Sequence, residues 1–548
     1  MKVLAKQIIL WLLVSAFIVS KAACRDARQN GITVAVNPTT TVNTTSATEG
    51  EDTVTTVVGN KGTTVSGGAV TTTTTSSKTT DGNTKAPSTV VVEKRPSVSN
   101  AAQLLNPMSG GADAEAEALR QAILNTEDQL VVTGTTYYVS PNGDDDNDGT
   151  SPEAAWRTLD GVALNRFLLQ PGDAVLFERG YIYRRESAFV VRNGVSYGAY
   201  GEGQKPALYG SVANYALSRW EPSGHKNIWK LPLTTTEAGI VVFNHGVAAG
   251  TPKYFGVHEL LENGDFYHDL TNGILYLYLD KGNPASVYND IEIGTRDDIM
   301  QVPSGTTGVT IDNLSFLYAG MFAFNAKENV GDIRITNCEF GWSGGCRFNN
   351  GKVGLGNGIS FWKNTSDVLV ENCWIYQAYD AGITPQGTEE AHTYKNLVFR
   401  KNLIEFCNYS IEFFDRNSAS VWDGLVIEDN IMRFAGYGFM PGDERPDSKI
   451  GVAHLLGWGW NYKELPGAGV VIRNNIFDCS SRNLVYWSGK TYTSGLTISG
   501  NSFYQMANKT GRVIQFASNG SKTATNQAEL EVAVRLFDPT AKVIKWLQ

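Results

Sequence analysis

The sequence predicts an all-β chain whose main body is a parallel β-helix, and three observations support this fold class. Short strand-like segments recur from Gly305 onward with one shared pattern of apolar and polar residues. Their spacing varies, as expected for coils that are joined by loops of different length. The same region contains no helical pattern that could connect the strands of a barrel or of a doubly wound sheet.

Each repeat consists of an apolar anchor, two mostly polar residues, a fixed position, one further residue and a second apolar residue. The anchors are Ile311, Ile335, Val370, Phe399, Ile427, Ile472 and Ile498. The fixed positions, three residues later, are Leu314, Cys338, Cys373, Asn402, Asn430, Asn475 and Asn501. Because the coils of a β-helix stack about 4.8 Å apart, the four successive asparagines predict an internal ladder of side-chain amides.

The six cysteines argue against a disulfide scaffold. No two of them form a CxxC pair and no histidines have the spacing of a zinc site, so the sequence predicts neither a metal centre nor another cofactor. Cys338 and Cys373 share the fixed position in neighbouring coils, where they would serve as small apolar fillers. A disulfide between these two cysteines is the alternative.

The first 22 residues predict a signal peptide. Lys2 and Lys6 precede an apolar run over 8–19 that is too short to span a membrane, and a small-residue cleavage site follows it at 20–22. We therefore expect a protein that is secreted or held at the cell surface, with a lipid anchor at Cys24 as the less favoured alternative. No other stretch is long and apolar enough for a transmembrane span.

Composition and pattern set the remaining boundaries. Residues 23–134 are rich in Thr and Ser and predict a disordered linker that contains a short helical segment over 112–125. Residues 135–298 are expected to form an N-terminal cap and a β-rich insert. The β-helix repeats would occupy 299–520, and 521–548 would form a C-terminal segment.

Residues 144–149 carry three aspartates at alternate positions followed by a glycine, which is how a calcium-binding loop begins. The position that should close such a loop with a glutamate is Ala155. A strand pattern precedes the run, and the residues after it predict a helix with Ser151 as N-cap and Pro152 in its first turn. The run is therefore interpreted as a turn between a strand and a capping helix, with calcium binding as the alternative.

Three groups of segments resemble secreted bacterial right-handed β-helix proteins of the pectate-lyase-like superfamily. "TYYVSPNGDDDNDGTSPEAAWRTLDGV", "LQPGDAVLFERG" and "SYGAYGEGQKPAL" resemble their opening segment, and "GDFYHDLTNGILYLYLDKGNPAS" resembles the β-rich insert that follows. "GNGISFW", "YDAGITPQG" and "ERPDSKIGVAHL" resemble motifs of their coils and loops. The resemblance covers about 135–503 and implies a right-handed β-helix. Many of these proteins are glycoside hydrolases or polysaccharide lyases, so the reaction stays open.

The loops that follow three neighbouring coils are the candidate site. Aligning Tyr379 with Tyr409 predicts Glu412 in one column with Gly382, and Asp380 two residues before that column. Carboxylates in one column lie about 5 Å apart on adjacent coils and about 9–10 Å apart on coils two apart, which brackets the separations found in glycosidases. We predict Asp380 and Glu412 as the catalytic pair.

The structural alternative for this pair is a turn cap at Asp380 and an ion pair between Glu412 and Arg416 or Arg445. A second cluster in the third loop consists of Asp443, assigned a catalytic role, and of Arg445 and Asp447, assigned to substrate binding. An arginine there could hold a uronate carboxylate or a sugar diol. The alternatives are a solvated charged loop or an Asp–Arg pair that satisfies itself and braces the insertion.

The remaining candidates contact substrate or carry protons. His454 is a candidate catalytic proton carrier, and His392 and Asp415 are candidates for substrate binding. Trp458 and Trp460 could stack on pyranose rings. A structural or packing role is the alternative for each histidine and tryptophan.

The most favoured function is an extracellular glycoside hydrolase that acts on a polysaccharide through paired carboxylates. A polysaccharide lyase is one alternative, with Lys395, Lys449 and Arg445 as candidate bases. A non-catalytic glycan-binding surface protein is another. The net charge of −9 and the pI of about 5.4 disfavour nucleic acid as a partner, and we expect a monomer.

Overall fold

The computed structural model describes residues 54–58, 70–75, 88–96, 108–128, 130–184, 187–348, 353–388, 390–441, 451–459, 469–487 and 494–548. The predicted signal peptide and Cys24 lie outside these residues, as do Asp443, Arg445, Asp447, Lys449 and Trp460. Among the helices in the described parts, none is long and apolar enough to cross a membrane.

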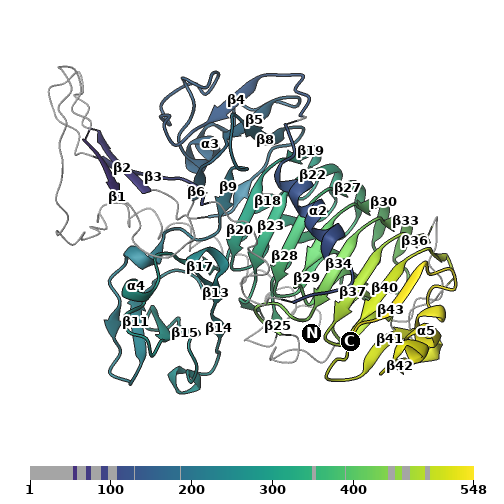
Figure 1. The fold of residues 1–548 in the computed structure, drawn as a ribbon. Helices are drawn as coiled ribbons and strands as arrows, with labels where there is room; N and C mark the ends of the chain where they lie inside the picture. Colours follow the sequence, from purple (N-terminus) through teal and green to yellow (C-terminus); the bar gives the residue numbers. More distant parts are fainter. Residues whose placement is uncertain are drawn as a thin grey trace, which may run out of the picture. The chain divides into compact units, whose positions relative to one another are not determined.

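Three ten-stranded sheets, named here sheets 1, 2 and 3, form the body of the protein (Figure 1). Sheet 1 consists of β4 (Thr136–Val139), β5 (Ala174–Glu178), β8 (Ser196–Tyr200), β19 (Thr307–Asp312), β22 (Gly331–Thr336), β27 (Thr365–Glu371), β30 (Thr393–Arg400), β33 (Val421–Glu428), β36 (Gly469–Arg473) and β39 (Leu496–Ser499). Sheet 2 consists of β6 (Ile182–Arg184), β9 (Ala207–Tyr209), β20 (Ser315–Ala319), β23 (Glu339–Ser343), β28 (Trp374–Ala378), β31 (Leu403–Glu405), β34 (Ile431–Ala435), β37 (Ile476–Ser480), β40 (Ser502–Gln505) and β43 (Val543–Trp546). Sheet 3 consists of β7 (Phe189–Val190), β18 (Met300–Val302), β21 (Phe324–Ala326), β26 (Ile359–Trp362), β29 (Ala381–Gln386), β32 (Tyr409–Asp415), β35 (Ala453–Gly459), β38 (Asn483–Trp487), β41 (Arg512–Phe516) and β42 (Ser521–Thr523).

The strands pair in parallel from coil to coil, except that β42 is antiparallel to β41. From β19 onward the chain visits sheets 1, 2 and 3 in turn, so the predicted parallel β-helix is confirmed. Alternate side chains of each strand point inward and form one continuous core. The inward Phe316 and Phe340 of adjacent coils stack with ring centroids 4.8 Å apart, which matches the spacing of the coils.

The asparagine ladder is confirmed at the corner between sheets 1 and 2. Asn402 Nδ2 donates to Asn430 Oδ1, Asn430 Nδ2 to Asn475 Oδ1, and Asn475 Nδ2 to Asn501 Oδ1, each at 3.0 Å. Asn501 Nδ2 donates to Asp538 Oδ2 at 2.8 Å. A carboxylate only accepts hydrogen bonds from such donors, so Asp538 ends the ladder.

The residue before each ladder position turns the corner in the left-handed region of backbone conformation. These residues are Asn313, Asn337, Asn372, Lys401, Asp429, Asn474 and Gly500, with φ between 53° and 67°. Asparagine and glycine adopt this conformation at low cost, which explains their frequency there. Cys338 and Cys373 occupy the ladder column as free, buried thiols, so they act as fillers and not as a disulfide.

The helix expected to begin at Ser151 starts seven residues later. Helix α3 spans Leu159–Asn165, and the Thr158 side chain caps it by accepting a hydrogen bond from the Gly161 N–H. The chain first runs beside β4, where the Trp156 N–H donates to Tyr138 O and Trp156 O accepts from the Ser140 N–H. These sheet-like bonds keep the preceding residues out of a helix, so the prediction of Ser151 as N-cap is wrong.

The aspartate run before α3 makes hydrogen bonds within its own turn. Asp144 Oδ1 accepts from the Asp146 N–H at 3.1 Å, and Asp148 Oδ1 accepts from the Thr150 N–H at 2.8 Å. Asp145 accepts from the N–H groups of Arg157 and Thr158 ahead of α3. The aspartates therefore have a role in the turn, and calcium binding at this run stays a prediction.

The β-rich insert forms two small antiparallel sheets with a core of their own. The five-stranded sheet has the order β10 (Glu221–Pro222), β11 (Ile228–Pro232), β16 (Ile274–Tyr278), β15 (Asp265–Asp269) and β14 (Thr251–Pro252), with β14 parallel to β15. The three-stranded sheet has the order β13 (Ala248–Ala249), β12 (Ala238–Phe243) and β17 (Ile291–Thr295). Helix α4 (Pro284–Val287) and the 3₁₀ turns Tyr215–Leu217, Asn244–Gly246 and Val257–Glu259 complete the insert.

Part of the segment predicted as a linker packs on the outer face of sheet 2. Strand β3 (Ser88–Glu93) forms an antiparallel sheet with β1 (Val54–Val58) and β2 (Val70–Thr75), and helix α2 spans Asp113–Leu124. On α2, Arg120 pairs with the buried Glu405 of β31 at 2.8 Å. Arg433 of β34 pairs with Glu405 and with Asp478, and also with Asp113 of α2. Ion pairs of this kind cannot be read from composition.

The C-terminal segment covers the C-terminal end of the β-helix core. Helix α5 (Gln527–Arg535) begins at Asn526, whose side chain accepts from the Glu529 N–H. Its buried residues Leu530 and Val534, with Phe537 just after it, pack against the last coils. Phe537 contacts Phe503 edge to face at a centroid distance of 6.2 Å.

Candidate functional site

A polar column runs along the outer face of sheet 3. Strand pairing places its members in register on successive coils: Gln301, Asn325, Ser360, Thr384 and Glu412. Their neighbours along each strand, such as Ile383 and Ile411, point into the core, so the column points outward. Gln301 is partly exposed, whereas Asn325, Ser360, Thr384 and Glu412 are buried, so a ligand along this face would have to displace the groups that cover them.

Glu412 marks the end of this polar column. The Thr384 hydroxyl donates to Glu412 Oε2 at 3.1 Å, and the residue that pairs with Glu412 on the next coil is the buried Leu456. Only 9% of Glu412 is exposed. A largely desolvated carboxylate between polar and apolar neighbours is the kind of group that proton-transfer catalysis uses.

Asp380 lies at the turn that leads into β29. Its N–H donates to Gly356 O at 2.9 Å, and its carbonyl accepts from the Tyr409 N–H at 3.0 Å. The residue is partly exposed. Its backbone is therefore held by the coils on both sides, while its side chain retains access to solvent.

The coil register differs from the one predicted by aligning the two tyrosines. Strand pairing sets Ile383 opposite Ile411. Tyr379 lies four residues before Ile383, whereas Tyr409 lies only two residues before Ile411. Glu412 consequently lies opposite Thr384, and the predicted column of Gly382 with Glu412 is wrong. The corners of neighbouring coils differ in length, so equal aromatic residues do not mark equal positions.

This register sets the separation of the predicted catalytic pair. Asp380 lies four residues before Thr384, about 13 Å along the strand at ~3.3 Å per residue, and one coil away from Glu412. Their Cα atoms are thus about 14 Å apart, too far for the ~5 Å between the carboxyl groups of a retaining glycosidase. The ~6.5–9.5 Å between the carboxyl groups of an inverting enzyme would require both side chains to extend toward each other along the sheet.

The structure brings Asp415 and His392 together, but in the interior. His392 Nδ1 lies 2.9 Å from Asp415 Oδ2, which also accepts from the Tyr394 hydroxyl at 3.0 Å. All three side chains are buried at the corner between sheets 3 and 1. A Cβ atom on Gly387 would lie 2.3 Å from Asp415 Oδ2 and 2.6 Å from His392 Nδ1, so this corner requires glycine. The cluster stabilises the corner. A sugar could contact Asp415 or His392 only if these buried side chains became exposed.

His454 also lies inside the β-helix. Its Nδ1 is 2.9 Å from Ser410 Oγ, and its Nε2 is 3.0 Å from Cys479 O. Burial lowers the pKa of His454 to about 3, so the imidazole is neutral at physiological pH. We therefore leave His454 out of the proposed site.

For the other predicted site residues the structure gives the backbone position only, or an exposed position away from the polar column, or no description. Asp443, Arg445, Asp447 and Trp460 lie outside the described residues, and of Trp458 only the backbone in β35 is described. That backbone pairs with Phe414 of β32, next to the coil of Glu412. Lys395, a candidate lyase base, is exposed on sheet 1 opposite Ser366 and Asp423, away from the polar column.

One acidic residue of this face was missed by the sequence analysis. Asp298, just before β18, is buried, and its Oδ2 accepts from Gln301 Nε2 and Asn325 Nδ2, both at 2.7 Å. Lys327 Nζ lies 3.5 Å from the same oxygen. The first coils lack the anchor pattern of the later repeats, so only the strand pairing reveals that these residues belong to the column.

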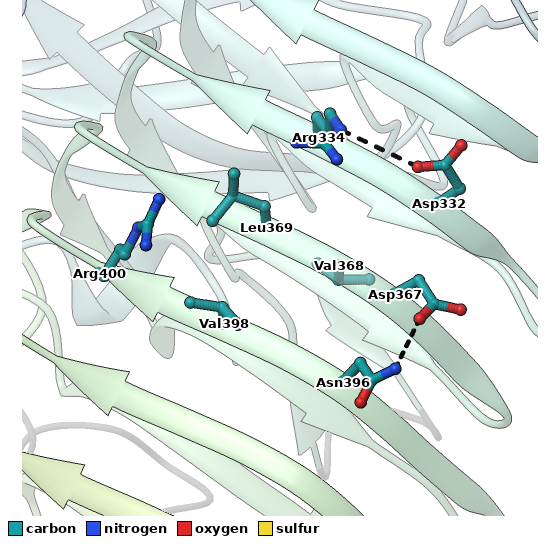
Figure 2. A pocket seen from close by; sticks show the side chains of 8 residues that line it. All are labelled: Asp332, Arg334, Asp367, Val368, Leu369, Asn396, Val398 and Arg400. Atoms are coloured by element: carbon teal, nitrogen blue, oxygen red, sulfur yellow. Dashed lines mark hydrogen bonds and ion pairs between the residues drawn. The ribbon is translucent and has the colours of Figure 1, made fainter.

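A shallow depression of about 290 Å³ lies on the outer face of sheet 1 (Figure 2). Its charged and polar groups are partners of one another or of adjacent residues. Arg334 lies 4.0 Å from Asp332, Asn396 Nδ2 donates to Asp367 Oδ1 at 2.8 Å, and Arg400 pairs with Glu371 at 2.8 Å. Asp367 and Arg400 thus have partners, whereas Asp332 and Arg334 form only a loose, exposed pair; we place the candidate site on sheet 3, where Glu412 is largely buried.

Comparison with known proteins gives one family match and one local match to a curated protein. The model described as "Right handed beta helix region" matches residues 287–441, less than a third of the chain. Lacto-N-biosidase from Bifidobacterium longum subsp. longum is 35% identical over 103 residues, which is 18% of this chain. The matched stretch spans only 6% of the length of that relative.

Two solved structures are similar to this chain at low sequence identity and with TM-scores below 0.5. One, described as a glycoside hydrolase, has a TM-score of 0.41 at 10% identity and covers 69% of this chain and 94% of its own. The other, described as the complex structure of XylC with xylose, has a TM-score of 0.38 at 12% identity and covers 68% of each chain. The family match and the strand pairing agree that this chain contains a right-handed parallel β-helix.

Proposed function

We propose that this chain is a glycan-active enzyme, a glycoside hydrolase whose essential carboxylate is Glu412. The observation that carries the proposal is the position of this buried carboxylate at the end of the outward polar column of sheet 3. The 103-residue likeness to a lacto-N-biosidase, named as a glycosidase, supports the same class of reaction. The predicted signal peptide supports action outside the cytoplasm.

Asp380 is the proposed second carboxyl group. A Cα separation of about 14 Å excludes direct attack by one carboxylate and leaves room for a water molecule between the two groups, provided that both side chains extend toward each other. One carboxyl group protonates the glycosidic oxygen as that bond breaks. The other takes a proton from the water that attacks the anomeric carbon from the opposite side of the ring, so the configuration inverts.

The rest of the polar column is proposed to hold the sugar chain. Gln301, Asn325, Ser360 and Thr384 carry amide and hydroxyl groups, which match the donors and acceptors of sugar hydroxyls. The one cation described beside these residues, Lys327, lies 3.5 Å from the buried carboxylate of Asp298. This composition favours neutral sugar residues over uronates at these positions.

The proposal is tested with purified protein and a panel of polysaccharides and oligosaccharides, with products identified by mass. We expect Glu412→Gln to lower the cleavage rate by about 10²–10⁴-fold, as for loss of a general acid or base, while the fold is retained. Asp380→Asn should act similarly. Asp367→Asn, which alters a carboxylate of the sheet 1 depression, is the matched control and should retain activity.

Two outcomes would contradict the proposal. Full activity of Glu412→Gln and Asp380→Asn in folded protein would exclude both carboxylates from the reaction. Release of an unsaturated, ultraviolet-absorbing product would show that the enzyme is a lyase. Nuclear magnetic resonance of the first product would decide between inversion and retention.

A further inference from the structure

The five-stranded sheet of the insert has two different faces. Alternate residues of β15 and β16, such as Phe266 and Leu275, are buried in the core of the insert. The residues between them point to the opposite side. That side carries Lys230, Tyr267, Tyr276 and Tyr278, all partly exposed, which together are called the tyrosine face.

The tyrosines of this face lie in register. Tyr267 stands directly opposite Tyr276, their ring centroids are 6.5 Å apart, and their planes lie within 15° of each other. On the neighbouring strand β11, Lys230 stands opposite Tyr276. The Tyr278 hydroxyl accepts a hydrogen bond from Asn227 Nδ2 at 3.1 Å. The result is a row of amphipathic rings on a rigid sheet rather than on a loop.

Arg347 acts electrostatically on Tyr267 of the tyrosine face and directly contacts Tyr254. Burial raises the pKa of Tyr267 and Asp269 adds to the rise, while the nearby positive charge of Arg347 opposes it. The Arg347 guanidinium lies 4.6 Å from the ring centroid of Tyr254, and Arg347 Nη1 donates to Tyr254 O at 3.2 Å. Arg347 begins the hairpin β24–β25 (Arg347–Phe348, Val353–Gly354), which precedes β26 of sheet 3.

Tyr254 continues the connection toward Asp380. Its hydroxyl donates to Gly345 O at 3.5 Å, and burial together with the nearby Tyr379 raises the pKa of Tyr254. Tyr379 immediately precedes Asp380. Phe255, next to Tyr254, is 74% exposed, which is unusual for an aromatic side chain on a folded surface.

We propose that the tyrosine face binds a sugar chain and extends the candidate site onto the insert. The inference rests on the proposed function, because it takes the same glycan as its ligand. Tyrosine rings would stack on the C–H faces of pyranose rings, and their hydroxyls and Lys230 would bond to sugar hydroxyls. The surface is one short row of amphipathic rings, whereas a stable protein partner needs about 1,000 Å² of interface.

The test is affinity electrophoresis in gels that contain xylan, polygalacturonate, arabinogalactan or mucin glycan. At least one of these polymers should retard the wild type, and the double variant Tyr267→Ala/Tyr276→Ala should bind it about tenfold more weakly, a loss of ~1.4 kcal/mol. Tyr138→Ala is the matched control, because Tyr138 is a partly exposed tyrosine that packs on Tyr200 in the N-terminal cap. Circular dichroism and thermal unfolding check that each variant is folded.

The outcomes separate this inference from the proposed function. Loss of polymer binding in the double variant, with unchanged cleavage of short oligosaccharides, supports the inference. Equal retardation of the double variant and the wild type, or retardation of the wild type by none of the four polymers, overturns it. Binding through the tyrosine face by a protein that cleaves no glycan would contradict the proposed function alone.

Discussion

The outer faces of sheets 2 and 3 differ in how their charged residues are used. Sheet 2 presents Glu405, Arg433 and Asp478 in one column, and each is buried beneath α2 and paired. Sheet 3 places neutral polar residues in register with Glu412, and Asn325, Ser360 and Thr384 among them are buried as well. A charged column on a β-helix therefore does not by itself indicate a site.

The reason for this difference is solvation. Charges that are buried by a covering segment must be paired, since leaving one alone costs several kcal/mol. On sheet 2 the N-terminal segment supplies the missing partners Arg120 and Asp113. A ligand-binding face needs groups that are held in place yet ready to take a new partner.

The largest effect is expected for Arg433→Met on the covered face. This change leaves the buried Glu405 and Asp478 without their shared partner, so we expect the free energy of unfolding to fall by about 3–5 kcal/mol. Urea titration measures it. Arg473→Met is the control, because Arg473 is half-exposed and pairs with Glu428, and its loss should cost at most about 1 kcal/mol. Similar losses in both variants would mean that α2 does not bury the cluster.

A pH dependence is expected where the first strand of sheet 2 meets the insert. Burial raises the pKa of Glu292 to about 8, although Arg184 Nη2 lies 2.7 Å away, and burial raises the pKa of Asp290 to about 6. Both pKa values are higher in the folded state than in the unfolded state. The contribution of these two carboxyl groups to the free energy of unfolding is therefore fully present below about pH 4. It declines as the pH rises through 6 and 8.

Thermal unfolding between pH 5 and pH 9 tests this dependence. The wild type should lose stability toward pH 9, and Glu292→Gln should flatten the upper part of the curve, because glutamine does not titrate. Asp269→Asn is the control, since Asp269 is partly exposed on the insert and its pKa is lowered by hydrogen bonds from Asn272. Identical curves for the wild type and Glu292→Gln would refute a pKa near 8.

The smallest effect on stability is expected at sheet 3, with Thr384→Val. The variant loses the hydroxyl bond to Glu412, which should cost about 1 kcal/mol of stability. We expect a severalfold lower kcat, because the carboxylate loses its orienting partner, and a higher KM, because Thr384 also belongs to the proposed sugar-binding column. Thr336→Val is matched, since the Thr336 hydroxyl donates to Asp312 on sheet 1 at 2.6 Å, and it should leave kcat unchanged. A lower kcat in both variants would point to a general loss of folding.

Much of the fold could be predicted from the sequence, and the site only in part. The ladder from Asn402 to Asn501 was readable because each coil repeats the same local requirement. The relation of Asp380 to Glu412 was not, because it depends on the number of residues in two unequal corners. His454 was likewise assigned a role at the surface although it points inward, since the alternation of a strand is irregular near a corner.

By itself the sequence determined the coils, the inward columns and the ladder, because hydrophobic periodicity and hydrogen-bond complementarity are local properties. The tertiary structure alone decided which outward faces are covered, which carboxylates share a column, and that Asp415 and His392 meet in the interior. Those facts depend on contacts between residues far apart in the chain. Their spacing is set by loop lengths and by the packing of α2 and the insert, which no local pattern encodes.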